Sequence, residues 1–574
     1  MKIALAQLNY HVGDFVNNVA RIVETIGKAK LQEADVVVFA ELSVCGYPPR
    51  DFLEFGDFIR RCDEAVETIA AKCHGIAAIV GAPSVNLAPK GKPLYNTAFF
   101  LADGKVLAKI HKTLLPNYDV FDEYRYFEPN RLPCSLVEYK GCHFALTICE
   151  DLWNIADDPL YVRNPMDELI TLRPDVLINI ASSPFNYNQR NIRCEVLARN
   201  ATTYNLPVFY VNQVGGQTEL IFDGGSMVVD SNGMVVAKLK EFEEDFMIYE
   251  HHKVTNSQPE SGNIQSSDHP AIHSSIPAFQ HSSIPVFQDA VLSPQATRLI
   301  HDALILGIRD YFGKMGFTKA ILGLSGGIDS AVTLVLAAKA LGNENVRAIL
   351  LPSQFSSYHS ITDARLLAEN MCVPFEIIPI EPACQSIEKT LQPQFEGLPF
   401  NITEENIQAR IRAVILMALS NKFGYILLNT SNKSEAAVGY GTLYGDMCGG
   451  LSVLGDVYKT QVYELARFIN QDSILIPENS ILKPPSAELR PGQKDSDSLP
   501  DYAILDQILF KYIEQCAGPE ELIRQGFDAV TVRRVLKLVN STEYKRYQTP
   551  PILRVSLKAF GMGRRMPIVA KYLS

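Results

Sequence analysis

The sequence predicts an α/β protein with two domains and a linker between them. Short apolar segments alternate with helical patterns from residue 1 to about 248, and this alternation returns from about residue 290. Residues 249–289 differ in composition and are rich in Ser, His, Gln and Pro. The chain has 574 residues, which is too long for a single hydrophobic core. We therefore expect one domain at 1–248, a linker at 249–289 and a second domain at 290–574.

Composition narrows the functional class. Hydrophobic residues make up 47% of the chain and charged residues 20%, as in proteins with large buried cores. No apolar run is long enough to span a membrane, and the strand-like N-terminus MKIALAQLNYHVGD has no signal-peptide core. A net charge of -11 disfavours a nucleic-acid-binding surface. The eleven cysteines show no CxxC spacing, so we expect reduced thiols in a cytoplasmic protein.

The first domain contains apolar segments typical of buried strands, with helical patterns around 16–30, 57–73 and 188–205. The predicted strands are KIALAQL, ADVVVFAEL, IAAIVGAP, HFALTICED, PDVLINIAS and PVFYVNQ. Two further stretches, 96–110 and 226–239, are predicted hairpins that turn at Asp-Gly and Asn-Gly. This half therefore combines α/β alternation with some antiparallel strands.

The predicted linker contains a tandem octapeptide, HSSIPAFQ at 273–280 and HSSIPVFQ at 281–288. Five of the eleven histidines lie within 251–281, which would suit a metal site. An extended segment stiffened by prolines is the favoured interpretation, because short duplications are tolerated where little packs against the chain.

The second domain repeats the order strand, helix, strand. Predicted strands at KAILGL, VRAILLP, VPFEIIPI and YILLNT are separated by predicted helices at 328–341, 361–371 and 404–420. This spacing predicts a doubly wound parallel sheet, in which ligands bind beyond the carboxyl ends of the strands. The stretch LGLSGGIDS lies at such an end.

That stretch predicts a phosphate-binding loop. Ser325, Gly326 and Gly327 form a tight turn, and the helix that follows at once offers free N–H groups and a partial positive charge. Ser330 adds a hydroxyl, and Asp329 would repel phosphate unless it held a metal ion that bridges phosphate oxygens. No lysine follows the second glycine, so the loop fits a pyrophosphate unit and attack at the α-phosphate. A glycine turn that only packs helix on strand is the alternative.

The ordered set Ser-Gly-Gly-x-Asp-Ser resembles the loop of the ATP pyrophosphatase group, and the second half resembles the NAD synthetases. The resemblance implies ATP contacts at Gly323, Leu324, Ser325, Gly326, Gly327, Ile328, Asp329, Ser330, Thr430 and Lys459. It implies contacts with deamido-NAD at Asn406, Arg410, Glu435 and Lys545. It also implies ATP as co-substrate and Mg²⁺ held by Asp329 and Glu435.

A second set of residues, in the first half, can cleave an amide. Glu41 ends an apolar strand in VVVFAELSVCGYPPRD, Lys112 follows another in AKIHKTLLPNYDV, and Cys149 ends a third in HFALTICEDLW. A lone cysteine at a strand end is usually part of a core, but an unpaired carboxylate there is costly. At one rim of a sheet, Glu41 can take the thiol proton of Cys149 and later activate water. Lys112 can stabilise the thiolate and the oxyanion.

These stretches resemble the nitrilase superfamily over most of residues 1–248. The resemblance implies a nitrilase-like α-β-β-α sandwich in which Glu41, Lys112 and Cys149 form the catalytic triad. Two neighbouring residues have open roles. Glu123 fits either a helper of the triad or a surface salt bridge, and Trp153 fits either a pocket wall or core packing.

The glutaminase subgroup of that superfamily implies glutamine contacts at Tyr118, Ser183 and Gln189. Many relatives have a basic residue at the last of these positions. Here Arg190 directly follows Gln189, so either of the two can bind glutamine.

A nitrilase-like half followed by a synthetase half resembles the glutamine-dependent NAD synthetases over nearly the whole chain. The resemblance implies a Rossmann-like second domain and ATP-dependent amidation of deamido-NAD by ammonia from glutamine. The intermediates would be a glutamyl-cysteine thioester and an NAD-adenylate, and the products NAD, AMP, pyrophosphate and glutamate. A homo-oligomer with an intersubunit ammonia tunnel is also implied, because bulk solvent protonates free ammonia.

Three other functions fit parts of the sequence. The chain can be a different ATP-pyrophosphatase amidotransferase that acts on a nucleotide base, or a nitrilase or amidase with a regulatory nucleotide-binding half. It can also be a nucleotide sensor without catalysis. The stretch 541–551 and the nitrilase-type half count against the first, and the three triad positions count against the last.

Overall fold

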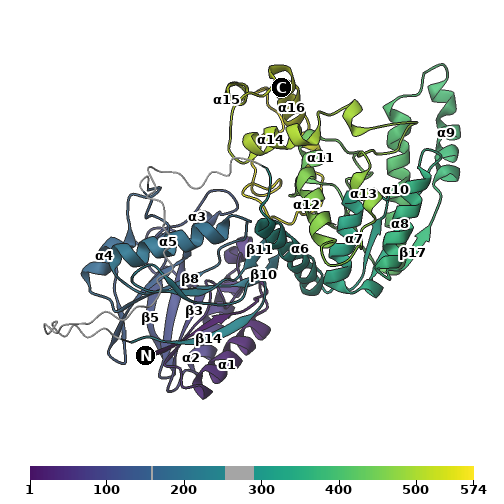
Figure 1. The fold of residues 1–574 in the computed structure, drawn as a ribbon. Coiled ribbons are helices and arrows are strands. Elements are labelled where there is room, and N and C mark those ends of the chain that lie inside the picture. Colours follow the sequence, from purple (N-terminus) through teal and green to yellow (C-terminus); the bar gives the residue numbers. More distant parts are fainter. Residues whose placement is uncertain (157–158, 253–289, 574) are drawn as a thin grey trace, which may run out of the picture.

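The computed structural model describes residues 1–156, 159–252 and 290–573. Two α/β bodies lie side by side, one from the purple-to-teal first half of the chain and one from the green-to-yellow second half (Figure 1). The tandem octapeptide 273–288 lies outside the described residues. Within the three described ranges, no helix is both long and apolar enough to cross a membrane.

Two six-stranded sheets form the centre of the first half. The first sheet comprises β1 (Lys2–Gln7), β2 (Val36–Val38), β3 (Ala77–Val85), β4 (Leu94–Ala102), β5 (Lys105–His111) and β14 (Asp245–Glu250). The second comprises β6 (Val137–Tyr139), β7 (Cys142–Ile148), β8 (Val176–Ala181), β9 (Val208–Asn212), β12 (Met227–Val229) and β13 (Val235–Lys238). The strand orders are β14-β1-β2-β3-β4-β5 and β13-β12-β9-β8-β7-β6. In each sheet three adjacent strands are parallel and the outer pairings are antiparallel.

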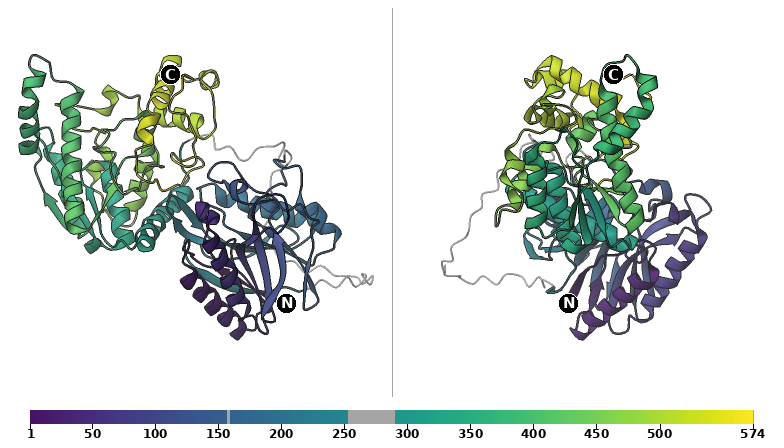
Figure 2. Two further views of the ribbon diagram at one scale, coloured as in Figure 1. Left: turned by 180° about the vertical axis from the view of Figure 1, so that it is seen from behind. Right: turned by 90° about the vertical axis from the view of Figure 1, so that its right-hand side faces the viewer.

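The sheets face each other, and helices cover their outer sides (Figures 1 and 2). Helices α1 (Phe15–Leu31) and α2 (Gly56–Ala70) pack on the first sheet, and α5 (Gln189–Tyr204) packs on the second. Along β1, Ile3 belongs to the core between the sheets, whereas Ala4 belongs to the core under the helices. Because both faces are buried, such strands are continuous apolar runs in the sequence. The predicted α-β-β-α sandwich is confirmed.

Strand β14 is absent from the segments predicted from the sequence. It pairs antiparallel with β1, from Gln7 opposite Asp245 to Lys2 opposite Glu250. Its residues are only partly buried, because it is an edge strand, and the acids of EEDFMIYE break the apolar pattern.

The second half contains one parallel sheet. Its strands are β15 (Ala320–Gly323), β16 (Val346–Leu350), β17 (Phe375–Ile377), β18 (Ile426–Asn429) and β19 (Leu451–Ser452), in the order β17-β16-β15-β18-β19. Its helices are α6 (Pro294–Met315), α7 (Ile328–Leu341), α8 (Tyr358–Asn370), α9 (Glu381–Phe395), α10 (Ile402–Phe423) and α12 (Lys459–Ile469). This is the predicted doubly wound fold. Its strand order reverses between β15 and β18, where such folds bind ligands.

A smaller helical layer is built from α11 (Lys433–Val438), which lies between β18 and β19 in the chain, and from helices that follow the sheet. It comprises α11, α14 (Tyr502–Ile513), α15 (Pro519–Arg524), α16 (Ala529–Ser541) and α17 (Glu543–Arg546). Leu505, Leu509, Val535 and Leu536 belong to a core of its own. This layer lies next to the carboxyl end of β18, because α11 begins four residues after that strand. The short helix α13 (Glu478–Leu482) instead packs on α7 and α8.

The two halves meet where the hairpin of β10 (Val214–Gln217) and β11 (Leu220–Asp223) packs on α6 (Figure 1). Asp310 of α6 accepts hydrogen bonds from the Gly216 N–H and the Asn9 side-chain amide, both at 2.7 Å. Lys314 donates to Asn9 Oδ1 at 2.7 Å and to the backbone carbonyls of Tyr10 and Gly216 at 2.8 Å. Burial lowers the pKa of Lys314 to about 8, although Asp310 acts to raise it. A polar network therefore fixes how α6 lies on the hairpin.

Candidate functional site

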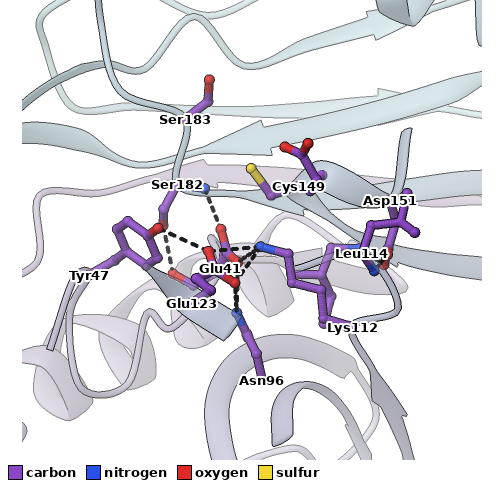
Figure 3. A network of polar contacts seen from close by, with 12 residues as sticks. Glu41, Tyr47, Asn96, Lys112, Leu114, Glu123, Cys149, Asp151, Ser182 and Ser183 are labelled. Carbon is purple, nitrogen blue, oxygen red and sulfur yellow. Dashed lines mark hydrogen bonds and ion pairs between the residues drawn. The ribbon is translucent and has the colours of Figure 1, made fainter. Parts of the chain in front are cut away.

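The three triad candidates come from three strands in two facing sheets. Glu41 lies three residues past β2, Lys112 directly follows β5, and Cys149 directly follows β7. In Figure 3 the side chains of Glu41 and Lys112 converge beside the Cys149 thiol. Lys112 Nζ donates to Glu41 Oε1 at 2.7 Å, and both side chains are fully buried. The structure thus brings the predicted residues together at one rim between the sheets.

Hydrogen bonds fix the Glu41 carboxylate. Oε1 also accepts from Asn96 Nδ2 at 2.8 Å, and Oε2 accepts from the Ser182 N–H at 3.0 Å (Figure 3). The Ser182 hydroxyl donates to the backbone carbonyl of Glu41 at 2.9 Å. Burial raises the pKa of Glu41 to about 7, although Lys112 and Asn96 act to lower it. A carboxyl group that titrates near neutrality can accept a proton and return it.

Glu123 is a second carboxylate on Lys112. Both of its oxygens accept from Lys112 Nζ, at 2.9 and 2.8 Å, and the Tyr47 hydroxyl donates to it at 2.9 Å. The Glu123 side chain is only 6% exposed, so the alternative of a surface salt bridge is wrong. Burial acts to lower the pKa of Lys112, but Glu123 and Glu41 outweigh it and hold that pKa well above its ordinary value. Lys112 therefore stays charged.

Cys149 begins a short 3-10 helix, Cys149–Leu152, with a φ of 43°. Residues other than glycine rarely adopt this left-handed conformation, and such strain is typical of functional positions. Burial, and then the charge of Glu41, raise the pKa of the Cys149 thiol well above its ordinary value. The resting thiol is therefore protonated and must give its proton to a base when it attacks a substrate.

Asp151 joins the segment after Lys112 to the segment that holds Cys149. Its Oδ1 accepts from the N–H groups of Thr113 and Leu114 at 3.0 and 2.8 Å, and its Oδ2 accepts from the Ile148 N–H at 3.0 Å. The sequence gives no signal for this role beyond an acid two residues after the cysteine.

The predicted glutamine contact Tyr118 binds the residue next to the nucleophile. Its hydroxyl donates to both Glu150 carboxylate oxygens, at 2.9 and 3.0 Å, and the Tyr161 hydroxyl donates to Glu150 at 3.0 Å. Burial raises the pKa of Glu150 to about 7. A carboxylate held by two phenols beside Cys149 suits the ammonium group of an amino acid. Sequence reasoning missed Glu150 and Tyr161.

Ser183 and Gln189 lie together after β8. The Ser183 N–H donates to Asn212 Oδ1 at 2.9 Å, and Gln189 Nε2 donates to Ser183 Oγ at 3.4 Å. Arg190 instead pairs with Glu241, with 3.1 Å between Nε and Oε1. Of the two alternatives, Gln189 is therefore the residue that lies with Ser183.

The loop at 324–327 joins β15 to α7 at the point where strand order reverses. Gly326 has a φ of +79°, and a Cβ atom there would lie 2.1 Å from the Ser360 carbonyl oxygen, so only glycine fits. The hydroxyls of Ser325 and Ser330 lie 3.1 Å apart, and Ser330 donates to the Gly327 carbonyl at 3.0 Å. Both serines shape the loop.

Asp329 and Glu435 lie on either side of Lys459. The Lys459 ammonium group pairs with Asp329 and lies 3.8 Å from Glu435 Oε1. Asn432 Nδ2 donates to Asp329 Oδ1 at 2.9 Å. Burial, and then the charge of Asp329, raise the pKa of Glu435 to about 8. Two hard carboxylates whose charges repel suit Mg²⁺, which takes one or two protein carboxylates together with substrate phosphates.

The other predicted contacts lie around β18. Thr430 directly follows that strand. Three of them contact the segment 439–443, namely Asn406, Arg410 and Lys545. Asn406 Oδ1 accepts a hydrogen bond from the Thr442 hydroxyl at 2.7 Å. Arg410 donates to one backbone carbonyl of that segment at 3.2 Å, and Lys545 donates to two, both at 2.8 Å. Within the described part of the chain, no cluster of three or more His, Cys, Asp or Glu side chains forms a ready metal site.

A cavity of about 570 Å³ lies between the two halves. Tyr47 and Glu123 line it from the first half, and Thr549 and Ile552 line it from the second. Thr549 and Ile552 also line a small pocket that contains Glu435. The cavity therefore adjoins the surroundings of both candidate sites.

Comparison with known proteins identifies the family. A family model described as carbon-nitrogen hydrolase matches residues 2–255, and one described as NAD synthase matches residues 300–549. The glutamine-dependent NAD(+) synthetase of Synechocystis sp. is 42% identical over 577 residues, which cover 99% of each chain. The chain belongs to the glutamine-dependent NAD(+) synthetase family. The family member of Thermotoga maritima is 40% identical over 581 residues, covering 100% of this chain and 99% of its own.

Solved structures of glutamine-dependent NAD(+) synthetases share this architecture. The enzyme from Acinetobacter baumannii, in complex with adenosine diphosphate, matches with a TM-score of 0.73 at 38% identity, covering 99% of this chain and 98% of that one. The enzyme from Cytophaga hutchinsonii matches with a TM-score of 0.80 at 20% identity over 99% and 98% of the chains, which shows a shared fold. The family resemblance stated from the sequence is confirmed.

Proposed function

We propose that this chain makes NAD from deamido-NAD, with ATP as the energy source and glutamine as the nitrogen donor. One observation carries the proposal: a single chain of this family holds a buried Cys-Lys-Glu site and a Ser-Gly-Gly phosphate loop at the switch point of a parallel sheet. Each site fits one half of a glutamine-dependent amidation. The chain is therefore a carbon-nitrogen ligase that hydrolyses glutamine.

In the first half, the Cys149 thiol attacks the side-chain amide of glutamine while Glu41 takes its proton. Lys112 stabilises the oxyanion, and the tetrahedral adduct collapses as Glu41 gives its proton to the departing nitrogen, which leaves as ammonia and gives a glutamyl thioester. Glu41 then activates water, which hydrolyses the thioester to glutamate and restores the thiol. The elevated pKa of Glu41, about 7, supports this exchange of protons.

Residues beside Cys149 are proposed to contact the glutamine substrate. Tyr118, Ser183 and Gln189 are the proposed glutamine contacts. Glu150 supports the assignment, because a buried carboxylate held by Tyr118 can pair with the ammonium group of glutamine. The pairing of Arg190 with Glu241 supports Gln189 over Arg190.

In the second half, the carboxylate of deamido-NAD attacks the α-phosphate of ATP and pyrophosphate leaves, which gives an NAD-adenylate. Ammonia then displaces AMP and forms the amide. The proposed ATP contacts are Gly323–Ser330, Thr430 and Lys459, and the proposed deamido-NAD contacts are Asn406, Arg410, Glu435 and Lys545. Asp329 and Glu435 would hold Mg²⁺, which when bound neutralises phosphate charge.

We also propose that residues 1–248 form the glutaminase, 249–289 a linker and 290–574 the synthetase, in a cytoplasmic homo-oligomer with an intersubunit ammonia tunnel. The cavity between the halves suits a section of such a passage, and its rim is open, since Tyr547 is 63% exposed. A second subunit would close it. Exposed apolar side chains on α10, including Val414 at 62%, support packing of a second copy. None of the eleven cysteines, all of which lie in described residues, forms a disulfide, which supports a reducing compartment.

The test of this function is NAD formation by the purified full chain with Mg-ATP, glutamine and deamido-NAD. We expect AMP, pyrophosphate, glutamate and NAD in equal amounts. A panel of other carboxylates and of nucleotide bases, assayed in parallel, separates this enzyme from other amidotransferases with the same loop. Hydrolysis of glutamine without any ATP consumption on every member of the panel would contradict the proposal.

A further inference from the structure

Three polar side chains form a row on one face of the second sheet of the first half. Thr147 of β7 pairs with Asn179 of β8, and Asn179 pairs with Tyr210 of β9. Paired residues of neighbouring strands point to the same face of a sheet. Arg193 Cζ of α5 lies 5.6 Å from the centre of the Tyr210 ring, so this is the face that α5 covers.

The middle residue of this row, Asn179, is only 1% exposed and only partly hydrogen-bonded. The layer between a sheet and its covering helix is usually apolar, and a polar group buried there costs free energy unless it is hydrogen-bonded. The Asn179 nitrogen donates two hydrogen bonds, but Oδ1 has no partner among the described residues. An apolar side chain of the same size would avoid that unpaired oxygen. The reason for an asparagine here therefore lies with its nitrogen.

Asn179 Nδ2 holds the backbone of the nucleophile. It donates to the Cys149 carbonyl oxygen at 3.4 Å and to Thr147 Oγ1 at 2.9 Å. The Thr147 hydroxyl gives its own proton to the Ile178 carbonyl at 3.3 Å, so it accepts from Asn179. The reverse orientation of the amide would place Oδ1 against the carbonyl oxygen of Cys149. This network therefore points the donor of Asn179 at Cys149.

The carbonyl that Asn179 holds belongs to a residue with a strained backbone. Cys149 has a φ of 43°, a conformation that side chains with a Cβ atom disfavour and that persists only where the surroundings enforce it. Asp151 Oδ2 accepts from the Ile148 N–H at 3.0 Å, directly before Cys149. Asp151 and Asn179 thus hold the backbone on both sides of the nucleophile, whose thiol lies beside Glu41 (Figure 3).

We propose that Asn179 is a positioning residue for glutamine hydrolysis, which keeps the Cys149 thiol beside Glu41 by holding the Cys149 carbonyl. It acts through the backbone of Cys149 rather than through the substrate. Without this hydrogen bond the backbone can relax to an ordinary conformation, which moves the thiol relative to its base. A small misplacement of a reacting group lowers turnover more than it weakens substrate binding. This inference rests on the proposed function.

The test is glutamine hydrolysis by the full-length chain with Mg-ATP and deamido-NAD present. Asn179→Ala removes the donor, and Asn179→Leu removes it while keeping the approximate size and shape of the side chain. In both variants we expect kcat to fall about 10-fold or more, with KM for glutamine within about 2-fold of wild type. NAD formation from ammonium should match the wild type, because the second half is unaltered.

A second measurement follows the thiol without any substrate. Iodoacetamide alkylates a thiol faster when a base is placed to take its proton, and mass spectrometry of the peptide that contains Cys149 gives the rate at that residue alone. The rate should fall about 10-fold in Asn179→Leu, in step with kcat. A side chain that only fills space would leave this rate unchanged.

The matched control is Asn200→Ala. Asn200, on α5, is also 1% exposed, and its Nδ2 likewise donates to two backbone carbonyls, those of Leu152 and Val196, both at 2.9 Å. Leu152 ends the 3-10 helix that Cys149 begins, so the control disturbs the same layer without releasing the nucleophile. We expect its kcat to stay within about 2-fold of wild type.

Four results would overturn the inference. These are an unchanged kcat in Asn179→Ala and Asn179→Leu, an equal loss of kcat in Asn200→Ala, a rise in KM alone, and failure of both Asn179 variants to fold. The third would make Asn179 a substrate contact, and the fourth would assign it to the fold. Absence of glutamine hydrolysis by the wild type would instead contradict the proposed function, which is a separate result.

Discussion

Glu123 and Lys112 form a buried bidentate ion pair, with both Glu123 oxygens within 2.9 Å of the Lys112 ammonium group. Glu41 contacts the same ammonium group at 2.7 Å, so one cation faces two carboxylates. Together with burial, the charge of Glu123 raises the pKa of Glu41. Glu123 therefore orients Lys112 and also makes Glu41 a stronger base.

Removal of the Glu123 charge should impair glutamine hydrolysis alone. Glu123→Gln weakens the hold on Lys112 and lowers the pKa of Glu41, so we expect kcat with glutamine to fall about 100-fold, the size of one lost electrostatic contribution. NAD formation from ammonium should be unchanged. Glu128→Gln, five residues along and bound to Arg131, is the matched control. A loss of equal size with both nitrogen donors would mean that Glu123 only supports the fold.

The pH dependence of glutamine hydrolysis should report Glu41. Because its folded-state pKa is about 7, the basic form grows as pH rises, and kcat/KM should rise through pH 7. The Asn96 amide lowers that pKa by donating to the carboxylate, so Asn96→Ala should move the rise to higher pH. Initial rates at a series of pH values decide this. A rise centred near 4.5, the ordinary value, would contradict the elevated pKa of Glu41.

Separate substitutions of Gln189 and Arg190 decide which of these two residues binds glutamine. Gln189 lies with Ser183, whereas Arg190 pairs with Glu241. Loss of a hydrogen bond to substrate costs about 1 kcal/mol or more, so Gln189→Ala should raise KM for glutamine about 10-fold. Arg190→Ala should change it less than 2-fold, since the arginine is held by Glu241 in a partly exposed ion pair. The opposite ranking of the two KM values would show that the arginine binds glutamine.

The phosphate loop should tolerate no side chain at Gly326. A Cβ atom there meets the Ser360 carbonyl oxygen at 2.1 Å, in a backbone conformation that alanine disfavours. Gly326→Ala should abolish Mg-ATP binding and NAD formation, and leave glutamine hydrolysis in the absence of ATP. Gly313→Ala, on α6 with open space around it, should raise the free energy of unfolding by about 1 kcal/mol. Normal ATP affinity in Gly326→Ala would remove the loop from the site.

The positions of the helices and of most strands, and the residues at the strand ends, can be predicted from the sequence. The helix predicted at 328–341 matches α7, and Glu41, Lys112 and Cys149 lie at the strand ends that their apolar runs indicate. These predictions succeed because hydrophobic period and chain order determine both features. Strand β14 is not predicted from the sequence, because an edge strand that is only partly buried needs few regularly spaced apolar residues.

Residues whose role depends on tertiary contact do not stand out in the sequence. Glu123 and Asp151 are ordinary acids there, and their roles depend on partners 11 and 37 residues away. Only the packed structure distinguishes such groups from solvated charges.

The most direct test of the account is NAD formation by the wild type and by Cys149→Ala, with glutamine or ammonium as the nitrogen donor, in the presence of Mg-ATP and deamido-NAD. We predict that Cys149→Ala loses synthesis from glutamine and keeps synthesis from ammonium near the wild-type rate. That result would show that the first half supplies ammonia and the second half uses it. Loss of synthesis from both donors, or continued synthesis from glutamine, would contradict this division of labour.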